Sequence, residues 1–266
     1  MNISPINNSK YSNAYISNQS FKSSNRVYIP AKMENYARDK IKTATCFFRD
    51  GLDWQKIPEL LMNNFKDKSK VNFYCFACSD GSEPLSYAML MLDKIPKEIR
   101  NKYLPIMASD IDEESISAAK SGFINITDED ILARITRNTS LSVNDMFKYY
   151  GDKLKLTEDT FARVPEYSHI TYKTQGELAN SVNFEQSDLI EALKKINDDG
   201  NTVISCRNVM FYFSKDYIQR FFETLGNTLK PNSLFIIGQN EIMAYADKYL
   251  EKLGFTEIAQ NVYRKN

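Results

Sequence analysis

From Val71 onward, short apolar segments alternate with stretches in which apolar residues recur at helical spacing. Five apolar segments are typical of buried strands: residues 71–78, 104–109, 182–186, 202–206 and 233–238. Strands that alternate with helices pair in parallel, through right-handed crossovers, and carry helices on both faces of the sheet. The pattern therefore predicts an α/β fold built on a mostly parallel sheet.

Signals for helix starts and ends lie between these strands. Pro84 suits a first helical turn, and Gly122 suits the end of a helix. Helices are predicted at residues 84–92, 112–121, 189–196, 215–229 and 241–253. Two last strands, residues 255–259 and 261–265, are predicted to form an antiparallel hairpin around Gln260, which completes a seven-stranded sheet.

Three regions depart from this alternation. Residues 1–30 are rich in Asn and Ser and bury too little apolar surface to offset their ordering entropy, so we expect a disordered tail. Residues 31–66 are expected to form a short helical segment, and residues 67–266 the main domain, with an insertion at about 123–180. The shorter elements predicted in these regions are helices at 31–42, 54–65, 128–136 and 142–150, and short strands or turns up to Lys173.

Composition narrows the classes of protein. Among 266 residues, 34 Lys and Arg balance 34 Asp and Glu, so there is no positive surplus for binding nucleic acid. No apolar run reaches the roughly 20 residues that span a bilayer, and residues 1–5 lack the features of a signal peptide. We expect a cytoplasmic monomer without membrane insertion and without a nucleic-acid partner.

The cysteines and the single histidine do not indicate a catalytic or metal site. Cys75 and Cys78 form a CxxC, but a zinc site would need a second pair or histidines at matching spacing. We therefore interpret both as buried strand residues. No nucleophile motif accompanies His169. We expect no metal and no chemistry that depends on His or Cys.

Polar residues follow three of the predicted strands. They are Ser79-Asp80-Gly81-Ser82-Glu83, Asp110-Ile111-Asp112 and, after residues 202–206, Arg207-Asn208. Open α/β sheets bind ligands at the carboxyl ends of their strands, so this edge is predicted to bind a nucleoside cofactor. The loop after residues 71–78 is not a dinucleotide GxGxxG, so we expect no pyrophosphate there.

The candidate cofactor residues each have an alternative structural role. Glu83 is expected at a helix start, where Ser82 or Glu83 could simply cap the helix. Asp110 is predicted to bind ribose hydroxyls, because the acidic residue two positions later is the better cap for the next helix. Asp188 could meet the edge of an adenine ring, with Leu189 against its face.

Arg49 and Tyr212 lie beside aromatic residues. Arg49 follows Phe47-Phe48 and could stack on them at the surface, or clamp a carboxylate with its planar guanidinium. Tyr212 lies between Phe211 and Phe213 and could belong to the core, or could point its hydroxyl at a reacting oxygen.

Five motifs follow one another between about residues 43 and 265. They are Thr45-Cys46-Phe47-Phe48-Arg49, Gly81-Ser82-Glu83-Pro84-Leu85-Ser86, Ala108-Ser109-Asp110-Ile111-Asp112, Cys206-Arg207-Asn208-Val209-Met210-Phe211-Tyr212-Phe213 and Leu229-Lys230-Pro231-Asn232-Ser233-Leu234. They resemble T-x-F-F-R, G-E-E-P-Y-S, A-[ST]-D-I-D, C-R-N-V-[ML]-I-Y-F and L-K-P-G-G-L of the CheR-type chemotaxis receptor methyltransferases. Those enzymes convert receptor glutamates to methyl esters with S-adenosylmethionine.

The resemblance implies a class I methyltransferase, Rossmann-like fold and S-adenosylmethionine as the cofactor. It implies a protein glutamate as the methyl acceptor, with a chemoreceptor cytoplasmic domain as the partner. It implies cofactor contacts at Thr45, Arg49, Glu83, Asp110, Asp188, Leu189, Arg207 and Tyr212. It also assigns Arg49 and Tyr212 to catalysis, beside the acceptor carboxylate. Residues 145–180 are implied to contain a small antiparallel β-subdomain, which in some members docks the receptor tail.

The chain departs from the family motifs at several positions. They are Thr43 for Asn, Ser82 for Glu, Leu85 for Tyr, Asp188 for Asn, and Gly238-Gln239-Asn240-Glu241 for G-H-S-E. Only about 40 residues precede Thr45, where the family has a helical domain that helps recognise the receptor. Two alternatives stay open: a methyltransferase for another protein or small-molecule acceptor, and a non-catalytic module that binds S-adenosylmethionine or S-adenosylhomocysteine.

Overall fold

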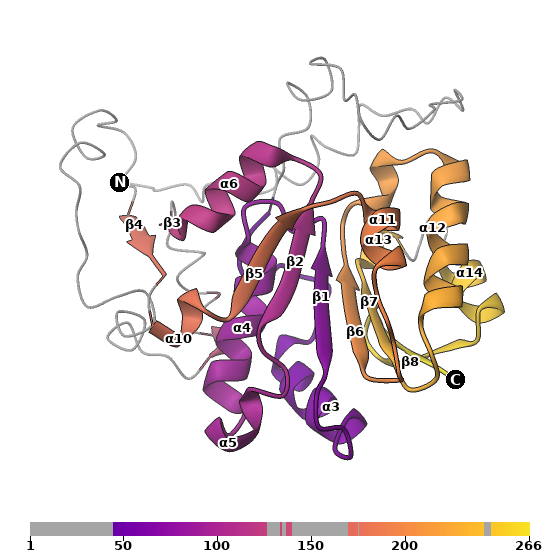
Figure 1. Ribbon diagram of the computed structural model, residues 1–266, viewed down its shortest axis with the longest axis horizontal. Helices are drawn as coiled ribbons and strands as arrows, with labels where there is room; N and C mark the ends of the chain where they lie inside the picture. Colours follow the sequence, from indigo (N-terminus) through magenta and orange to yellow (C-terminus); the bar gives the residue numbers. More distant parts are fainter. Residues whose placement is uncertain (1–44, 127–133, 135–136, 140–169, 175, 242–245) are drawn as a thin grey trace, which may run out of the picture.

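The computed structural model describes residues 45–126, 134, 137–139, 170–174, 176–241 and 246–266, and Figure 1 shows how their helices and strands are arranged. The strands are β1 (Asn72–Phe76), β2 (Ile106–Asp110), β3 (Phe123–Ile126), β4 (Ile170–Lys173), β5 (Val182–Gln186), β6 (Thr202–Cys206), β7 (Leu234–Ile237), β8 (Phe255–Ala259) and β9 (Val262–Lys265). The α-helices are α3 (Ile57–Asn64), α4 (Ser82–Lys94), α5 (Lys97–Arg100), α6 (Glu113–Ser121), α10 (Gly176–Ala179), α11 (Leu189–Lys194), α12 (Lys215–Thr228), α13 (Gln239–Glu241) and α14 (Asp247–Lys252). Two 3-10 turns are η1 (Trp54–Lys56) and η2 (Met210–Tyr212).

The main sheet has seven strands in the order β5-β2-β1-β6-β7-β9-β8. Its neighbouring strands pair in parallel except for β9, which runs antiparallel to both β7 and β8. The predicted α/β fold, with seven mostly parallel strands and an antiparallel last strand, is therefore confirmed. The chain passes from β1 to β2 on one side and later reaches β6 on the other, so the strand order reverses at β1. Ligands bind at such a switch point, outside the carboxyl ends of the strands.

The central strands contribute alternate residues to two hydrophobic clusters, one on each face of the sheet. Leu234 and Ile236 of β7 belong to the cluster that includes residues of α3 and α4. Phe235 and Ile237 belong to the cluster that includes residues of α11 and α12. Strands covered on both faces consist of nearly continuous apolar residues, which explains why the sequence predicted them clearly.

The predicted elements agree closely with the structure along the main sheet. Each of its seven strands begins and ends within two residues of the prediction. The helix predicted at residues 54–65 consists of η1 and α3, and the one predicted at 84–92 extends from Ser82 to Lys94. The helix predicted at 241–253 corresponds to α14, and residues 242–245 lie outside the described residues.

Three elements of only four residues were not predicted, because they are too short to show a periodic pattern of apolar residues. These are α5, α10 and β3, and β3 pairs antiparallel with β4. The β-subdomain implied at 145–180 stays a prediction, because the structure describes only residues 170–174 and 176–180 of that range. The tail at 1–30 and the helices predicted at 31–42 and 142–150 lie outside the described residues. Of the helix predicted at 128–136, the structure describes Arg134 alone, in helical conformation. Within the described ranges, no helix has the length and apolar character needed to cross a membrane.

A buried carboxylate joins the turns that precede β6 and β7. Asp198 Oδ2 accepts hydrogen bonds from the backbone N–H of Lys230 at 2.6 Å and from the Ser233 hydroxyl at 2.6 Å. Its Oδ1 accepts from the backbone N–H of Asn201 at 3.2 Å. These contacts lie at the amino ends of the strands, away from the predicted ligand edge, so we expect them to affect stability alone.

We expect Asp198→Ala to lower the free energy of unfolding by about 1–3 kcal/mol, because buried donors lose their acceptor. Urea unfolding at pH 7 measures the loss. The matched control is Asp199→Ala, an exposed neighbour, which should stay within about 0.5 kcal/mol of the parent. Equal stabilities of the two variants would contradict the assigned role of Asp198.

Candidate active site

The loop between β1 and α4 is braced by a carboxylate at the end of β2. Asp110 Oδ2 accepts a hydrogen bond from the backbone N–H of Ser79 at 2.8 Å, and its Oδ1 accepts from that of Asp112 at 2.9 Å. The loop passes through left-handed backbone, with φ of 51° at Ser79 and 89° at Gly81. Such angles are unfavourable for residues with a Cβ atom, so the Asp110 carboxylate stabilises a turn that would otherwise be strained.

The two acidic residues after β2 have separate roles. Asp112 caps α6, as predicted, since its side chain accepts from the backbone N–H of Ser115 at 2.9 Å. Burial raises the pKa of the Asp110 carboxyl, and hydrogen bonds from the N–H groups of Asp112 and Ser79 oppose that rise. Each oxygen of a carboxylate can accept two hydrogen bonds, so Asp110 retains capacity for a ribose hydroxyl. Ribose binding stays a prediction.

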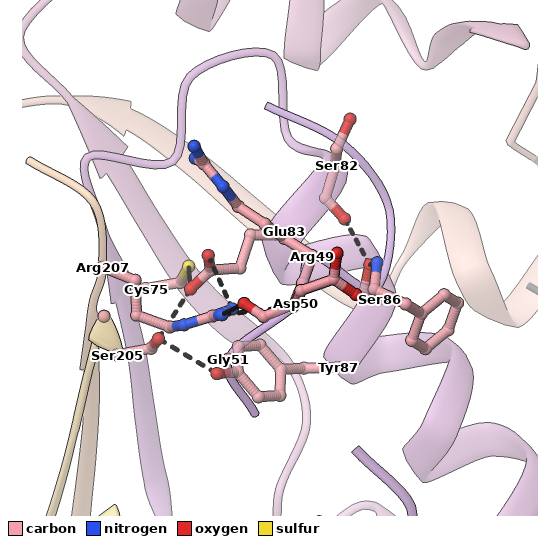
Figure 2. A network of polar contacts seen from close by, with 12 residues as sticks. Arg49, Asp50, Gly51, Cys75, Ser82, Glu83, Ser86, Tyr87, Ser205 and Arg207 are labelled. Carbon is pink, nitrogen blue, oxygen red and sulfur yellow. Dashed lines mark hydrogen bonds and ion pairs between the residues drawn. The ribbon is translucent and has the colours of Figure 1, made fainter. Parts of the chain in front are cut away.

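Glu83 points into the protein, toward the end of β6, as Figure 2 shows. Its Oε1 accepts from the Ser205 hydroxyl at 2.6 Å, and its Oε2 lies 3.3 Å from Nη1 of Arg207. The alternative in which Ser82 or Glu83 caps α4 is wrong. The Ser82 backbone N–H instead donates to Asp80 Oδ1 at 2.9 Å, so an aspartate before the helix serves as the acceptor.

Arg207 is 4% exposed and joins three distant parts of the chain. Besides Glu83, its guanidinium reaches the backbone carbonyls of Arg49 at 3.2 Å and Asp50 at 2.9 Å through Nη2. It also lies 5.4 Å from the centre of the Trp54 ring, a cation–π distance. Burial is the largest single influence and lowers the pKa of Arg207, but the negative charge of Glu83, together with Tyr87, Glu241 and Cys75, outweighs it and the pKa is raised. The guanidinium therefore stays charged in the interior.

Arg49 lines a cavity beside this network. The cavity has a volume of about 360 Å³ and is lined by Cys46, Arg49, Asp50, Gly51, Arg134, Asn208, Gln239 and Asn240. Figure 2 shows the Arg49 side chain directed away from the guanidinium of Arg207. Arg134 forms a two-pronged ion pair with Asp50, with N–O distances of 3.0 and 3.2 Å. The cavity wall is thus polar and carries two guanidinium groups.

Tyr212 ends the 3-10 turn η2, which follows Asn208, a residue of the cavity wall. It is 45% exposed, so the alternative in which Tyr212 belongs to the core is wrong. Its ring lies 4.5 Å from that of Phe211, centre to centre, and the latter is also exposed. The turn begins at Met210, which is buried and whose backbone N–H donates to Glu241 Oε1 at 2.8 Å.

Asp188 and Leu189 occupy the first turn of α11. Asp188 caps this helix, because its Oδ1 accepts from the backbone N–H of Ile190 at 2.9 Å, and its Oδ2 accepts from the Tyr217 hydroxyl at 2.8 Å. Leu189 is buried in the cluster with α12. The predicted adenine contacts of both residues stay predictions, as does the cofactor contact of Thr45, which is half-buried.

Sequence reasoning missed three residues of this site. Ser205 is a polar residue inside an apolar strand, which is itself a signal of an internal hydrogen bond. Trp54 is the single tryptophan of the chain, and its indole N–H donates to the Arg49 carbonyl at 2.9 Å. Glu241 is the last residue of the Gly238–Glu241 motif, and the sequence indicated no role for it, although its carboxylate accepts from the Met210 N–H. Across the described part of the chain, no three His, Cys, Asp or Glu side chains group in a way that could hold a metal ion.

The fold and this edge of the sheet are those expected of a class I S-adenosylmethionine-dependent methyltransferase. The strand order reverses at β1, and acidic residues follow β1 and β2 at the edge where a nucleoside binds. The residues fit that cofactor. Asp110 can accept from ribose hydroxyls, and the buried Ser79 hydroxyl lacks a hydrogen-bond partner among the described residues, so a bound ligand would satisfy it.

Comparison with known proteins specifies the family. Residues 43–140 and 127–259 match the family described as CheR methyltransferase, SAM binding domain. The match covers more than half of the chain, so the chain belongs to the CheR methyltransferase family and uses S-adenosylmethionine. The resemblance inferred from the five motifs is confirmed.

Several relatives carry the name chemotaxis protein methyltransferase. That of Listeria monocytogenes is 27% identical over 213 residues, which cover 78% of this chain and 68% of the relative. Chemotaxis protein methyltransferase 2 of Pseudomonas aeruginosa is 25% identical over 227 residues, covering 85% of this chain and 73% of the relative. That of Salmonella typhimurium is 28% identical over 198 residues, covering 74% and 59% respectively.

We expect Arg207→Met to lower the free energy of unfolding by about 3–5 kcal/mol, because it leaves the Glu83 carboxylate partly buried without its cation. Adding Glu83→Gln should recover part of that loss, with a coupling of about 0.5–3 kcal/mol in a double-mutant cycle of urea unfolding. The matched control is Arg100→Met, which removes a more exposed pair with Glu177 and should cost at most about 1 kcal/mol. Strictly additive effects at Glu83 and Arg207 would show that the pair does not interact energetically.

Proposed function

We propose that this protein transfers the methyl group of S-adenosylmethionine to a glutamate side-chain carboxylate of a chemoreceptor. The names of its relatives support a chemotaxis substrate. The observation that carries the glutamate is the polar cavity of about 360 Å³ whose wall includes the Arg49 guanidinium. A planar guanidinium binds a carboxylate through two parallel hydrogen bonds, which fixes its orientation as well as its position.

Methyl transfer from S-adenosylmethionine to a carboxylate requires little acid–base catalysis by the protein. The bound cofactor supplies a methyl group attached to a positively charged sulfur. A glutamate is already ionised at neutral pH, so it attacks without a strong general base. The protein has to hold the acceptor oxygen in line, about 3 Å from the methyl carbon, and keep water out.

The residues around the cavity divide this work. We assign the Arg49 guanidinium to binding and orienting the acceptor carboxylate. We assign the hydroxyl of Tyr212, a residue that is 45% exposed, to donating a hydrogen bond to the same group. Arg134 is already paired with Asp50, the residue that follows Arg49.

Two residues of the cavity wall support a second candidate function, methylation of another acceptor. Gln239 and Asn240 line the cavity, at the positions where the family motif has His and Ser. The chain therefore differs from the family on the acceptor side, so a methyltransferase for another protein or small molecule is the alternative to test. The chemistry of the product distinguishes the two.

We expect the purified protein to transfer radiolabelled methyl groups from S-adenosylmethionine to a band of receptor size in membranes that contain chemoreceptors. The label should be released as methanol at alkaline pH, because methyl esters hydrolyse there. Excess S-adenosylhomocysteine is the control and should abolish labelling. A base-stable label would favour another acceptor, and tight cofactor binding in calorimetry without transfer to any acceptor would favour a non-catalytic binding module.

We expect Arg49→Ala to slow transfer about 100-fold and Tyr212→Phe at least about tenfold, because each removes a donor to the reacting carboxylate. Cofactor affinity should fall much less in both variants, as measured by calorimetry. Arg100→Ala, on α5 at the opposite end of the sheet, is the control for loss of a positive charge. Transfer at the parental rate in both site variants would refute these assignments.

A further inference from the structure

Glu241 is 1% exposed, and each of its carboxylate oxygens accepts hydrogen bonds from the backbone. Its Oε1 accepts from the N–H groups of Val209 at 2.5 Å and Met210 at 2.8 Å, and its Oε2 accepts from that of Gly238 at 2.8 Å. No described Lys or Arg forms an ion pair with it. Burial raises the pKa of the Glu241 carboxyl, and the N–H donors oppose that rise.

Two of the amides that Glu241 binds, those of Val209 and Met210, belong to the turn that carries Tyr212. Asn208 has a left-handed φ of 59°, and the chain then enters η2, where the Tyr212 N–H donates to the Val209 carbonyl at 3.0 Å. The first amides of such a turn have no acceptor within it. Because Met210 is buried, its unpaired N–H would cost about 1–3 kcal/mol, so the turn depends on the carboxylate for its shape.

The absence of a side chain at Gly238 leaves room for the Glu241 carboxylate and for the turn at Asn208. A Cβ atom at position 238 would lie 2.5 Å from Glu241 Oε2 and 3.0 Å from the backbone nitrogen of Asn208. Any side chain there would therefore displace the carboxylate or the turn. The spacing of Gly238 and Glu241, with two residues between them, is explained by this close approach.

We propose that Glu241 is a positioning residue for Tyr212: its carboxylate fixes the turn so that the Tyr212 hydroxyl reaches the methyl acceptor. The inference rests on the proposed function, since it concerns the step in which Tyr212 takes part. It extends that function to a residue that contacts neither cofactor nor acceptor and acts through the backbone. Gln239 and Asn240, between Gly238 and Glu241, line the acceptor cavity, so the same motif builds both features.

The test compares Glu241→Gln with the parent. The glutamine amide places an N–H2 group against at least one backbone N–H, so at least one hydrogen bond is lost. We expect kcat to fall at least about tenfold, because a small displacement of a reacting group is costly. The KM for S-adenosylmethionine should change less than about threefold, and quenching of Trp54 fluorescence provides an independent measure of cofactor binding. Gly238→Ala displaces the same carboxylate by another route and should reproduce the loss of kcat.

Two controls separate positioning from a general loss of stability. Asp198→Ala weakens the opposite end of β6 and should retain the parental kcat at a temperature where it is folded. In the Tyr212→Phe background, Glu241→Gln should cost much less than in the parent, because the hydroxyl it positions is already absent. Hydrogen exchange supplies a readout without activity: the Val209 and Met210 amides should lose protection in Glu241→Gln.

The outcomes separate the inference from the proposed function. An active parent whose Glu241→Gln variant keeps the parental kcat, or loses the same factor in both backgrounds, overturns the positioning role alone. A parent that transfers no methyl group to any acceptor overturns the proposed function. In that case, unchanged protection of the two amides overturns the role of Glu241 in the turn as well, and lost protection supports it.

Discussion

The buried guanidinium of Arg207 is the interaction on which the rest of the site depends. It joins the end of β6 to Glu83 on α4 and to the carbonyls of Arg49 and Asp50. A guanidinium presents its donors in fixed directions, so it can bind a carboxylate on one side and carbonyls on the other, which a lysine cannot do. An unpaired charge in the interior would cost several kcal/mol. Burial of Arg207 therefore requires that all these segments come together.

Around this guanidinium, the loops are held by carboxylates that accept backbone N–H groups. Asp110 binds the loop after β1, Asp188 the start of α11, and Glu241 the turn after β6. Each of these loops follows a strand whose position is fixed by the sheet. The edge is thus organised by the protein's own hydrogen bonds, so little ordering is left for the moment of binding, and that favours both affinity and correct alignment of reacting groups.

Prediction and structure agree most closely where the sequence pattern is local, as in an apolar run that forms a buried strand or a cap next to its helix. The central strands β6 and β7 were predicted within two residues because both of their faces are covered and their residues are almost all apolar. Asp112 was recognised as a cap because a cap bonds to an N–H only a few residues away. The alternative in which Ser82 or Glu83 caps α4 is wrong, because the acceptor of the Ser82 N–H is Asp80, which lies before the left-handed residue Gly81 rather than in the helix.

By itself, the sequence determined the order of strands and helices, the family and the set of residues gathered at one edge. Apolar runs, turn residues and short motifs are properties of neighbouring positions, so they can be read without coordinates. Only the tertiary structure decided the partners of the polar side chains: Glu83 with Ser205, 122 positions away, and Glu241 with Met210, 31 positions away. Such hydrogen bonds depend on strand order and register, which bring distant segments within 3 Å of one another and leave no trace in local sequence.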